Sequence, residues 1–292
     1  MWARWYGSIV ERFRSWATED SSVRAAMIVG SQARTTEPAD EWSDLDLVVF
    51  HTEPEKLIAS MEWFRRFGTV VLSMVEPTAV LNNKERRVIY SDGRDVDFAV
   101  FPASYLPYVA HTPEGASVLS RGYHVLVDKD HQLENVPEVL AQSRRPGGRL
   151  PRAEEFEGLV ADFWYHILWV AKKLRRGELW TAKMGCDGYL KRLLVPMMEW
   201  QATVHDGVKT DVWHDGRFLE RWAPSFVRSR IPATFAQYDS KDLERALRET
   251  GQLFSLLARE VATATGARYP ADAEAKVWTL VDRTLHDGDA RG

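Results

Sequence analysis

The chain has 292 residues, 45% hydrophobic and 27% charged, the composition of an ordinary globular protein, and its length allows two domains. A net charge of −4 argues against nucleic acid as the main partner, and the single cysteine, Cys186, excludes an intrachain disulfide. No apolar run approaches the roughly 18 residues of a membrane span. Because the N-terminus also has no signal-peptide pattern, we expect a cytoplasmic protein without a membrane or nucleic-acid partner.

The first half of the chain alternates strand and helix patterns. Large apolar residues from Trp2 to Trp16 recur at helical spacing, which predicts an amphipathic helix packed on the fold. A second helix is predicted over Pro54–Phe67 from the period of its apolar residues. Six short apolar runs predict strands, namely Ala25–Gly30, Leu45–Phe50, Thr69–Val75, Arg87–Ser91, Val96–Phe101 and His124–Val127.

A segment rich in arginine, proline and glycine, residues 143–151, follows this half. It shows no periodicity, so we interpret it as a solvated linker at a domain boundary. From Arg152 onward the pattern is helical, with a long apolar stripe over residues 156–174 that Gly177 closes. Three more helices are predicted, over residues 182–204 with a bend at Pro196, from the capping pair Asp239-Ser240 onward, and over residues 273–285.

These patterns indicate an α+β fold of two domains. Residues 1–145 are expected to form an α/β domain with a mixed sheet, and residues 150–292 a helical bundle. Since clefts between two such domains are common ligand sites, we expect the substrates to bind there.

The most informative stretch is a small turn followed by two spaced carboxylates. Gly30 and Ser31 follow an apolar strand, and Asp44 and Asp46 stand two residues apart on the next predicted strand. Because side chains alternate along a strand, the two aspartates point to one face, where their like charges repel. Mg²⁺ relieves such repulsion and commonly links protein carboxylates to substrate phosphates. The pattern therefore suggests a phosphoryl- or nucleotidyl-transfer site.

A third carboxylate, Asp97, completes this candidate site. It lies in the predicted strand Val96–Phe101, and apolar residues flank it on both sides. A buried carboxylate must be paired or bound to a metal, which makes a solvated strand end the less attractive interpretation. Asp95 shares the face of Asp97 but lies nearer the strand start, where exposure is expected.

GSQAR, then SDLDL, then a strand with VDF resembles the nucleotidyltransferase superfamily built on the polymerase-beta-like core. Further segments are similar to the aminoglycoside 6-adenylyltransferases, the streptomycin adenylyltransferase family. The resemblance spans about residues 20–270 in order and is looser over residues 184–193 and 210–232. The segments that narrow it are Leu126–Asp130, Pro151–Phe156, Asp162–Trp164 with Lys172, Arg176–Leu179 and Met197–Trp200.

The resemblance implies an adenylyltransferase that uses ATP and two Mg²⁺ ions and releases pyrophosphate. Asp97 would either share the second ion or act as the general base, and the sequence leaves both roles open. The implied metal-binding and catalytic residues are Asp44, Asp46 and Asp97. The implied nucleotide-binding residues are Gly30, Ser31, Arg34 and Lys172, with a solvated lysine as the alternative for the last.

The acceptor implied by the resemblance is a cationic antibiotic, with the 6-position of streptomycin as first choice. Glu155, Asp162 and His166 lie on one face of the long helix and, with Asp97, are the candidate acceptor-binding residues. A helix-start role for Glu155 and a structural role for His166 are the alternatives. A lincosamide, an RNA end or a protein acceptor also stays open, as does a non-catalytic nucleotide-binding role, which the intact aspartates disfavour. We expect a monomer.

Overall fold

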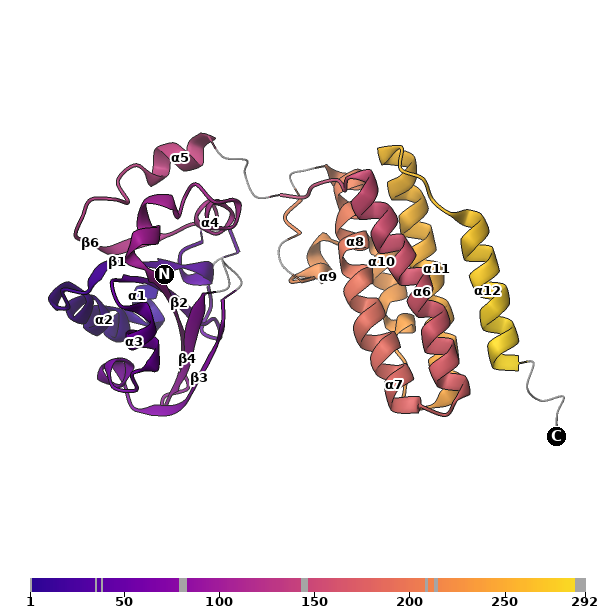
Figure 1. Cartoon of the computed structure of the whole chain (residues 1–292), viewed down its shortest axis with the longest axis horizontal. Helices are drawn as coiled ribbons and strands as arrows, with labels where there is room; N and C mark the ends of the chain where they lie inside the picture. The colour runs from indigo at the N-terminus through magenta and orange to yellow at the C-terminus, as the bar shows by residue number, and fades with distance from the viewer. Residues whose placement is uncertain are drawn as a thin grey trace. The chain divides into compact units, whose positions relative to one another are not determined.

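The computed structural model describes residues 2–34, 36–37, 39–78, 83–142, 147–207, 210–212 and 215–286. The chain divides into two compact units, Met1–Pro146 and Gly147–Gly292, and each is described by itself (Figure 1). The linker predicted over residues 143–151 lies partly outside the described residues. Among the described helices, none is both long and apolar enough to cross a membrane.

The first unit is built on a mixed six-stranded sheet. Its strand order is β3-β4-β5-β2-β1-β6, in which only β2 and β5 run parallel and every other neighbouring pair is antiparallel. The predicted strands are all present, with bounds that differ by a few residues. They are β1 Val23–Val29, β2 Leu45–His51, β3 Val70–Pro77, β4 Lys84–Tyr90, β5 Asp95–Pro102 and β6 His124–Asp128.

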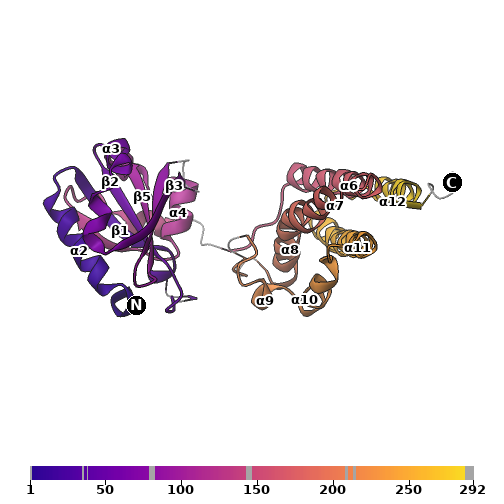
Figure 2. The same cartoon turned by 90° about the horizontal axis from the view of Figure 1, so that it is seen from below.

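Helices cover both faces of this sheet (Figure 2). Along β2, Leu45, Leu47 and Val49 pack on one face, whereas Phe50 packs on the other, as the period of two requires. The first face is covered by α1 Trp2–Trp5, α2 Gly7–Glu19, α3 Pro54–Ala59 and the 3₁₀ turn η2 Trp63–Phe67. The second face is covered by the 3₁₀ turn η3 Ala103–Tyr108, α4 Pro113–Leu119 and α5 Val136–Gln142.

Two predicted helices of this unit are each broken in two. The N-terminal helix is interrupted at Tyr6, between α1 and α2. The single helix predicted over Pro54–Phe67 was wrong, because Ser60 adopts an extended conformation that ends α3. The buried Trp63 then donates its indole N–H to the carbonyl oxygen of Leu57, which fixes the second, 3₁₀ segment against the core. Tertiary packing overrides the helical period here.

The second unit is a helical bundle (Figure 1). Its core includes a parallel stack of Phe163 on Phe254, with ring centroids 3.6 Å apart. The unit contains α6 Ala153–Arg175, α7 Leu179–Lys183, the π-helical segment η4 Met184–Tyr189, α8 Leu190–Asp206, α9 Leu219–Trp222, α10 Ser225–Arg230, the 3₁₀ turn η5 Ile231–Thr234, α11 Ser240–Thr265 and α12 Ala271–His286. The α+β fold class with a C-terminal helical bundle is therefore confirmed.

The ends of the long helices follow their sequence signals. Gly177 follows α6 with φ 73°, and Asp239 caps α11 by accepting the N–H groups of Lys241 and Asp242. The helix predicted over residues 182–204 differs, because α7 and α8 are joined through the π-helical turn η4. Pro196 lies inside α8.

Candidate active site

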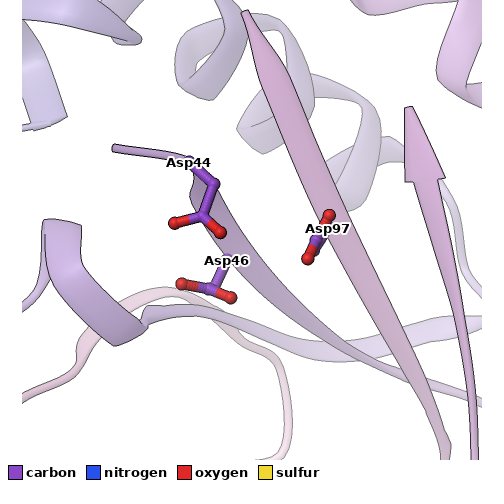
Figure 3. A group of neighbouring side chains, drawn as sticks. All are labelled: Asp44, Asp46 and Asp97. Carbon is purple, nitrogen blue, oxygen red and sulfur yellow. The ribbon is translucent and has the colours of Figure 1, made fainter. Parts of the chain in front are cut away.

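Three aspartates meet on the second face of the sheet. Asp46 of β2 and Asp97 of β5 are directly paired in the parallel register, and Asp44 lies one residue before β2 begins. Each side chain offers a carboxylate oxygen, and these oxygens all lie within 4.8 Å of one another (Figure 3). The predicted placement of Asp44 on the strand was wrong by one residue, yet its carboxylate still joins the other two.

The electrostatics of this cluster favour a bound cation. The pKa of Asp46 is raised to about 8, mainly by burial and further by the negative charges of Asp44 and Asp97. The positive charge of Arg34 acts in the opposite direction. Burial also raises the pKa of Asp97 to about 7 against the lowering influence of Arg87. Converging carboxylates are costly unless a proton or cation offsets their charge. Oxygen-only ligands of this kind suit Mg²⁺, so the residues fit the metal that the sequence implies.

The glycine of the turn is required by Asp46. Gly30 opens the 3₁₀ turn η1 Gly30–Gln32 with φ 66°, a left-handed conformation that glycine adopts without strain. A Cβ atom at this position would lie 1.8 Å from Oδ2 of Asp46. The turn backbone therefore packs directly on a cluster carboxylate, which links the Gly-Ser motif to the aspartates in space.

Two polar side chains of the same turn are buried beside this backbone. Ser31 is 6% exposed, and its hydroxyl oxygen has no hydrogen-bond partner within the described part of the chain. Gln32, 1% exposed, donates from Nε2 to the carbonyl oxygen of Ser43 at 3.4 Å, and Tyr6 donates its hydroxyl to the same oxygen at 3.0 Å. Gln32 and Tyr6 thus anchor the segment that leads into Asp44, and the sequence had singled out neither.

Strand β4 adds charged groups that the sequence analysis missed. Arg87 is paired in register with Asp97, and its Nε lies 3.2 Å from Oδ2 of Asp97. The same Nε contacts Glu85 at 3.0 Å and Glu76 of β3 at 2.8 Å. Burial raises the pKa of Glu85, and Glu85 in turn helps to raise the pKa of Asp46. Glu76, Glu85 and Arg87 are far from Asp44 in sequence, so their place beside the aspartates follows only from the order of the strands in the sheet.

The second unit gathers a polar cluster around Asp162 of α6. Tyr189, the last residue of η4, donates its hydroxyl to the two carboxylate oxygens of Asp162 at 2.9 and 3.1 Å. His166 lies one turn further along α6, with Nδ1 2.7 Å from Oδ1 of Asp162. Its ring centroid is 4.3 Å from that of Tyr189. The sequence had named Asp162 and His166 as candidate acceptor-binding residues. It had not named Tyr189, because the π-helical turn determines where the Tyr189 side chain points.

The other two predicted residues of α6 have simpler surroundings. The carboxylate of Glu155 accepts hydrogen bonds from both terminal nitrogens of Arg149, at 2.7 and 3.0 Å, and from the backbone N–H of Arg152, at 2.9 Å. These hydrogen bonds lower the pKa of Glu155 to about 2, and the bonds from Arg149 contribute most. The structure thus gives Glu155 the helix-start role that the sequence offered as an alternative. Lys172 is exposed near the C-terminal end of α6.

Comparison with known proteins decides the family. The family model described as streptomycin adenylyltransferase matches residues 4–284. The chain belongs to this family. Membership confirms the resemblance seen in the sequence and makes the chain an enzyme of the nucleotidyltransferase class, for which a nucleoside triphosphate and a divalent metal ion are the expected requirements.

Two relatives that match most of this chain are distant from it in sequence. An aminoglycoside 6-adenylyltransferase of Bacillus subtilis (strain 168) is 21% identical over 268 residues, which cover 90% of this chain and 92% of the relative. One from Campylobacter jejuni is 20% identical over 264 residues and covers 88% of each chain. A crystal structure of an aminoglycoside 6-adenyltransferase from Bacillus subtilis aligns with a TM-score of 0.48 and 18% identity, over 95% of this chain and 98% of that one.

Proposed function

We propose that the protein transfers AMP from Mg-ATP to a hydroxyl group of a cationic aminoglycoside, with streptomycin as the first candidate. The observation that carries the proposal is the convergence of Asp44, Asp46 and Asp97 beside the Gly30 turn. The names of the distant relatives support an aminoglycoside acceptor. We place the activity in the cytoplasm, where ATP and Mg²⁺ are available, and expect a monomer.

The nucleotide side of the reaction falls to the first unit. Asp44, Asp46 and Asp97 would hold one or two Mg²⁺ ions. Bound Mg²⁺ neutralises phosphate charge and polarises the reacting groups. Ser31 has a buried hydroxyl without a partner in the described residues and is suited to donate to a phosphate oxygen. Arg34 supplies further positive charge for the triphosphate, and the resemblance adds Lys172 as a candidate nucleotide-binding residue.

The transfer itself needs a base and an oriented hydroxyl group. The acceptor oxygen attacks the α-phosphorus, the bond from that phosphorus to the bridging oxygen breaks, and pyrophosphate leaves. The acceptor proton passes to a carboxylate, for which we propose Asp97. Burial raises the pKa of Asp97 to about 7 in the metal-free protein, and a bound cation would lower it, so the carboxylate would be ionised and able to accept the proton.

We place acceptor recognition on Asp162 and His166 of the second unit. The carboxylate of Asp162 is 37% exposed and is oriented by Tyr189 and His166, so it can receive an ammonium or guanidinium group. Glu155 is the weaker candidate, because Arg149 already occupies its carboxylate.

A mass measurement tests the proposed function directly. The protein is incubated with Mg²⁺, one nucleoside triphosphate at a time, and a panel of aminoglycosides, a lincosamide and a short RNA. We expect ATP and an aminoglycoside to give a product heavier by one adenylyl group. The Asp44→Asn variant is the control for a contaminating enzyme. Modification of the lincosamide or RNA alone, or of nothing, contradicts the proposal.

A further inference from the structure

One arginine of β4 joins three carboxylates from three neighbouring strands. The Nε atom of Arg87 lies 2.8 Å from Oε1 of Glu76, 3.0 Å from Oε1 of Glu85 and 3.2 Å from Oδ2 of Asp97. The register explains the contact, because Arg87 is opposite Asp97 and Glu85 is opposite Glu76. The side chains of Glu85 and Asp97 are only 14% and 12% exposed. The cation is therefore fixed at a largely buried member of the aspartate cluster.

The arrangement has two opposite effects on Asp97. Contact with a guanidinium fixes the direction of the carboxylate, and Glu76 and Glu85 in turn fix the guanidinium. The same positive charge weakens the attraction of the aspartate cluster for a metal cation. A cross-strand ion pair of this kind can also stabilise the sheet, so the two roles must be separated by experiment.

We propose that Arg87 is a positioning residue, which holds Asp97 in the orientation needed for transfer while offsetting part of its charge. Glu76 of the edge strand β3 and Glu85 of β4 anchor Arg87. The inference rests on the proposed function for the role of Asp97. It adds three residues to the site, and the sequence motif includes none of them.

The two effects predict opposite changes when the arginine is removed. In Arg87→Met, the affinity for Mn²⁺ without nucleotide rises, because the cluster loses a nearby positive charge. One unit charge a few ångströms from a divalent ion changes binding by about tenfold even in a water-like dielectric, whereas freeing one carboxylate rotamer costs only roughly threefold. The turnover number falls by about tenfold or more, because Asp97 is no longer held, while KM for Mg-ATP changes little.

The experiment compares four proteins: wild type, Arg87→Met, Arg87→Lys and Lys84→Met. Lys84 is the matched control, since it lies on the same strand, points to the opposite face and pairs with Glu55 at 2.5 Å. Mn²⁺ binding is measured by electron paramagnetic resonance at pH 8, and kcat and KM by product formation. We expect Arg87→Lys to recover part of the turnover, and added guanidinium ion to recover part of it in Arg87→Met.

Each outcome bears on the inference. Unchanged turnover in Arg87→Met overturns it, and so does weaker Mn²⁺ binding together with a lower unfolding midpoint, which would reveal a purely structural residue. If the wild-type protein modifies no acceptor, the proposed function fails. The Mn²⁺ comparison then decides the inference alone, and affinity equal to wild type in Arg87→Met overturns it.

Discussion

Asp46 and Asp97 stand directly opposite each other on the parallel strands β2 and β5. Like charges in such paired positions destabilise a sheet. Asp44 adds a third carboxylate within 4.8 Å, and the Gly30 turn packs against Asp46. The arrangement is unfavourable for the sheet alone and fits the proposed metal site.

Replacing Asp46 by Asn should stabilise the metal-free protein and abolish transfer. In the folded protein the pKa of Asp46 is raised to about 8, so at pH 8 the carboxylate costs folding energy that an amide does not. At pH 8 this carboxylate is partly ionised, so we expect the substitution to raise the free energy of unfolding measurably. Chemical denaturation at pH 8 without metal measures the gain, and added Mg²⁺ should stabilise only the wild type.

Asp95→Asn is the control for this change. Asp95 lies on the same face of β5 but is exposed and outside the cluster. The Asp95→Asn variant should keep a turnover number close to that of the wild type, and added Mg²⁺ should stabilise it against denaturation as much as it stabilises the wild type. Wild-type turnover in Asp46→Asn would show that the site is assigned to the wrong residues.

The pH dependence follows from the raised pKa of Asp97. Burial and neighbouring acids raise this pKa to about 7, above the ordinary value of an aspartate. The penalty on folding is absent below the pKa of the unfolded chain, grows as pH rises from that value to about 7, and is complete above about 7. Protons on Asp97 and on Asp46 compete with the metal in the same range, so Mn²⁺ affinity should rise by about tenfold or more from pH 6 to pH 8.

Titration calorimetry with Mn²⁺ at the two pH values checks this prediction. Asp97→Asn should show a flatter pH dependence, because one of the competing protonation sites is gone. Equal Mn²⁺ affinity of the wild type at both pH values would mean that the aspartates are already ionised at pH 6, which would contradict the raised pKa of Asp97.

The sequence predicted the strands because each is a short run of aliphatic or β-branched residues. It placed the start of β4 at Arg87, since Lys84, Glu85 and Arg86 are charged and do not read as strand. In the sheet, the buried Arg86 donates to the carbonyl oxygen of Ile58, and the largely buried Glu85 lies on the face of the aspartate cluster. A single-sequence pattern cannot supply such a partner, because strand order is a property of the whole fold.

The three aspartates were predictable for a different reason. Their chemistry is local, since i, i+2 spacing fixes Asp46 relative to Asp44, and only Asp97 needed a long-range contact. Tyr189 was not predictable, because its contact with Asp162 depends on the π-helical turn between α7 and α8. A π-helical turn shifts every later residue around the helix axis and leaves no clear signal in the sequence.

Gly30→Ala should remove activity and lower stability. The new Cβ atom would meet Oδ2 of Asp46 at 1.8 Å, so either the turn or the carboxylate must move. The left-handed conformation alone costs about 1–2 kcal/mol in an L residue. Gly93→Ala separates the two effects, because Gly93 has φ 82° but open space around its missing Cβ. Both variants should unfold more easily, and only Gly30→Ala should lose turnover per folded molecule. Equal turnover in both would contradict the packing of the turn on Asp46.

Asp162→Asn should raise the KM for the aminoglycoside much more than the KM for Mg-ATP. The reason is that the carboxylate of Asp162 is oriented by Tyr189 and His166 but retains an exposed fraction of 37% for a cationic group. Exposed charge pairs weaken with added salt, so the acceptor KM of the wild type should rise with ionic strength and that of Asp162→Asn much less.

Glu155→Gln provides the contrast on the same helix. It removes a carboxylate that Arg149 and the N–H of Arg152 already occupy, so it should lower thermal stability and leave the acceptor KM nearly unchanged. Tyr189→Phe should fall between the two, because Asp162 keeps its charge and loses one donor that orients it. Steady-state kinetics with each substrate varied in turn, at low and high salt, measure all three variants. An Asp162→Asn enzyme impaired only toward Mg-ATP would assign this cluster to the nucleotide instead of the acceptor.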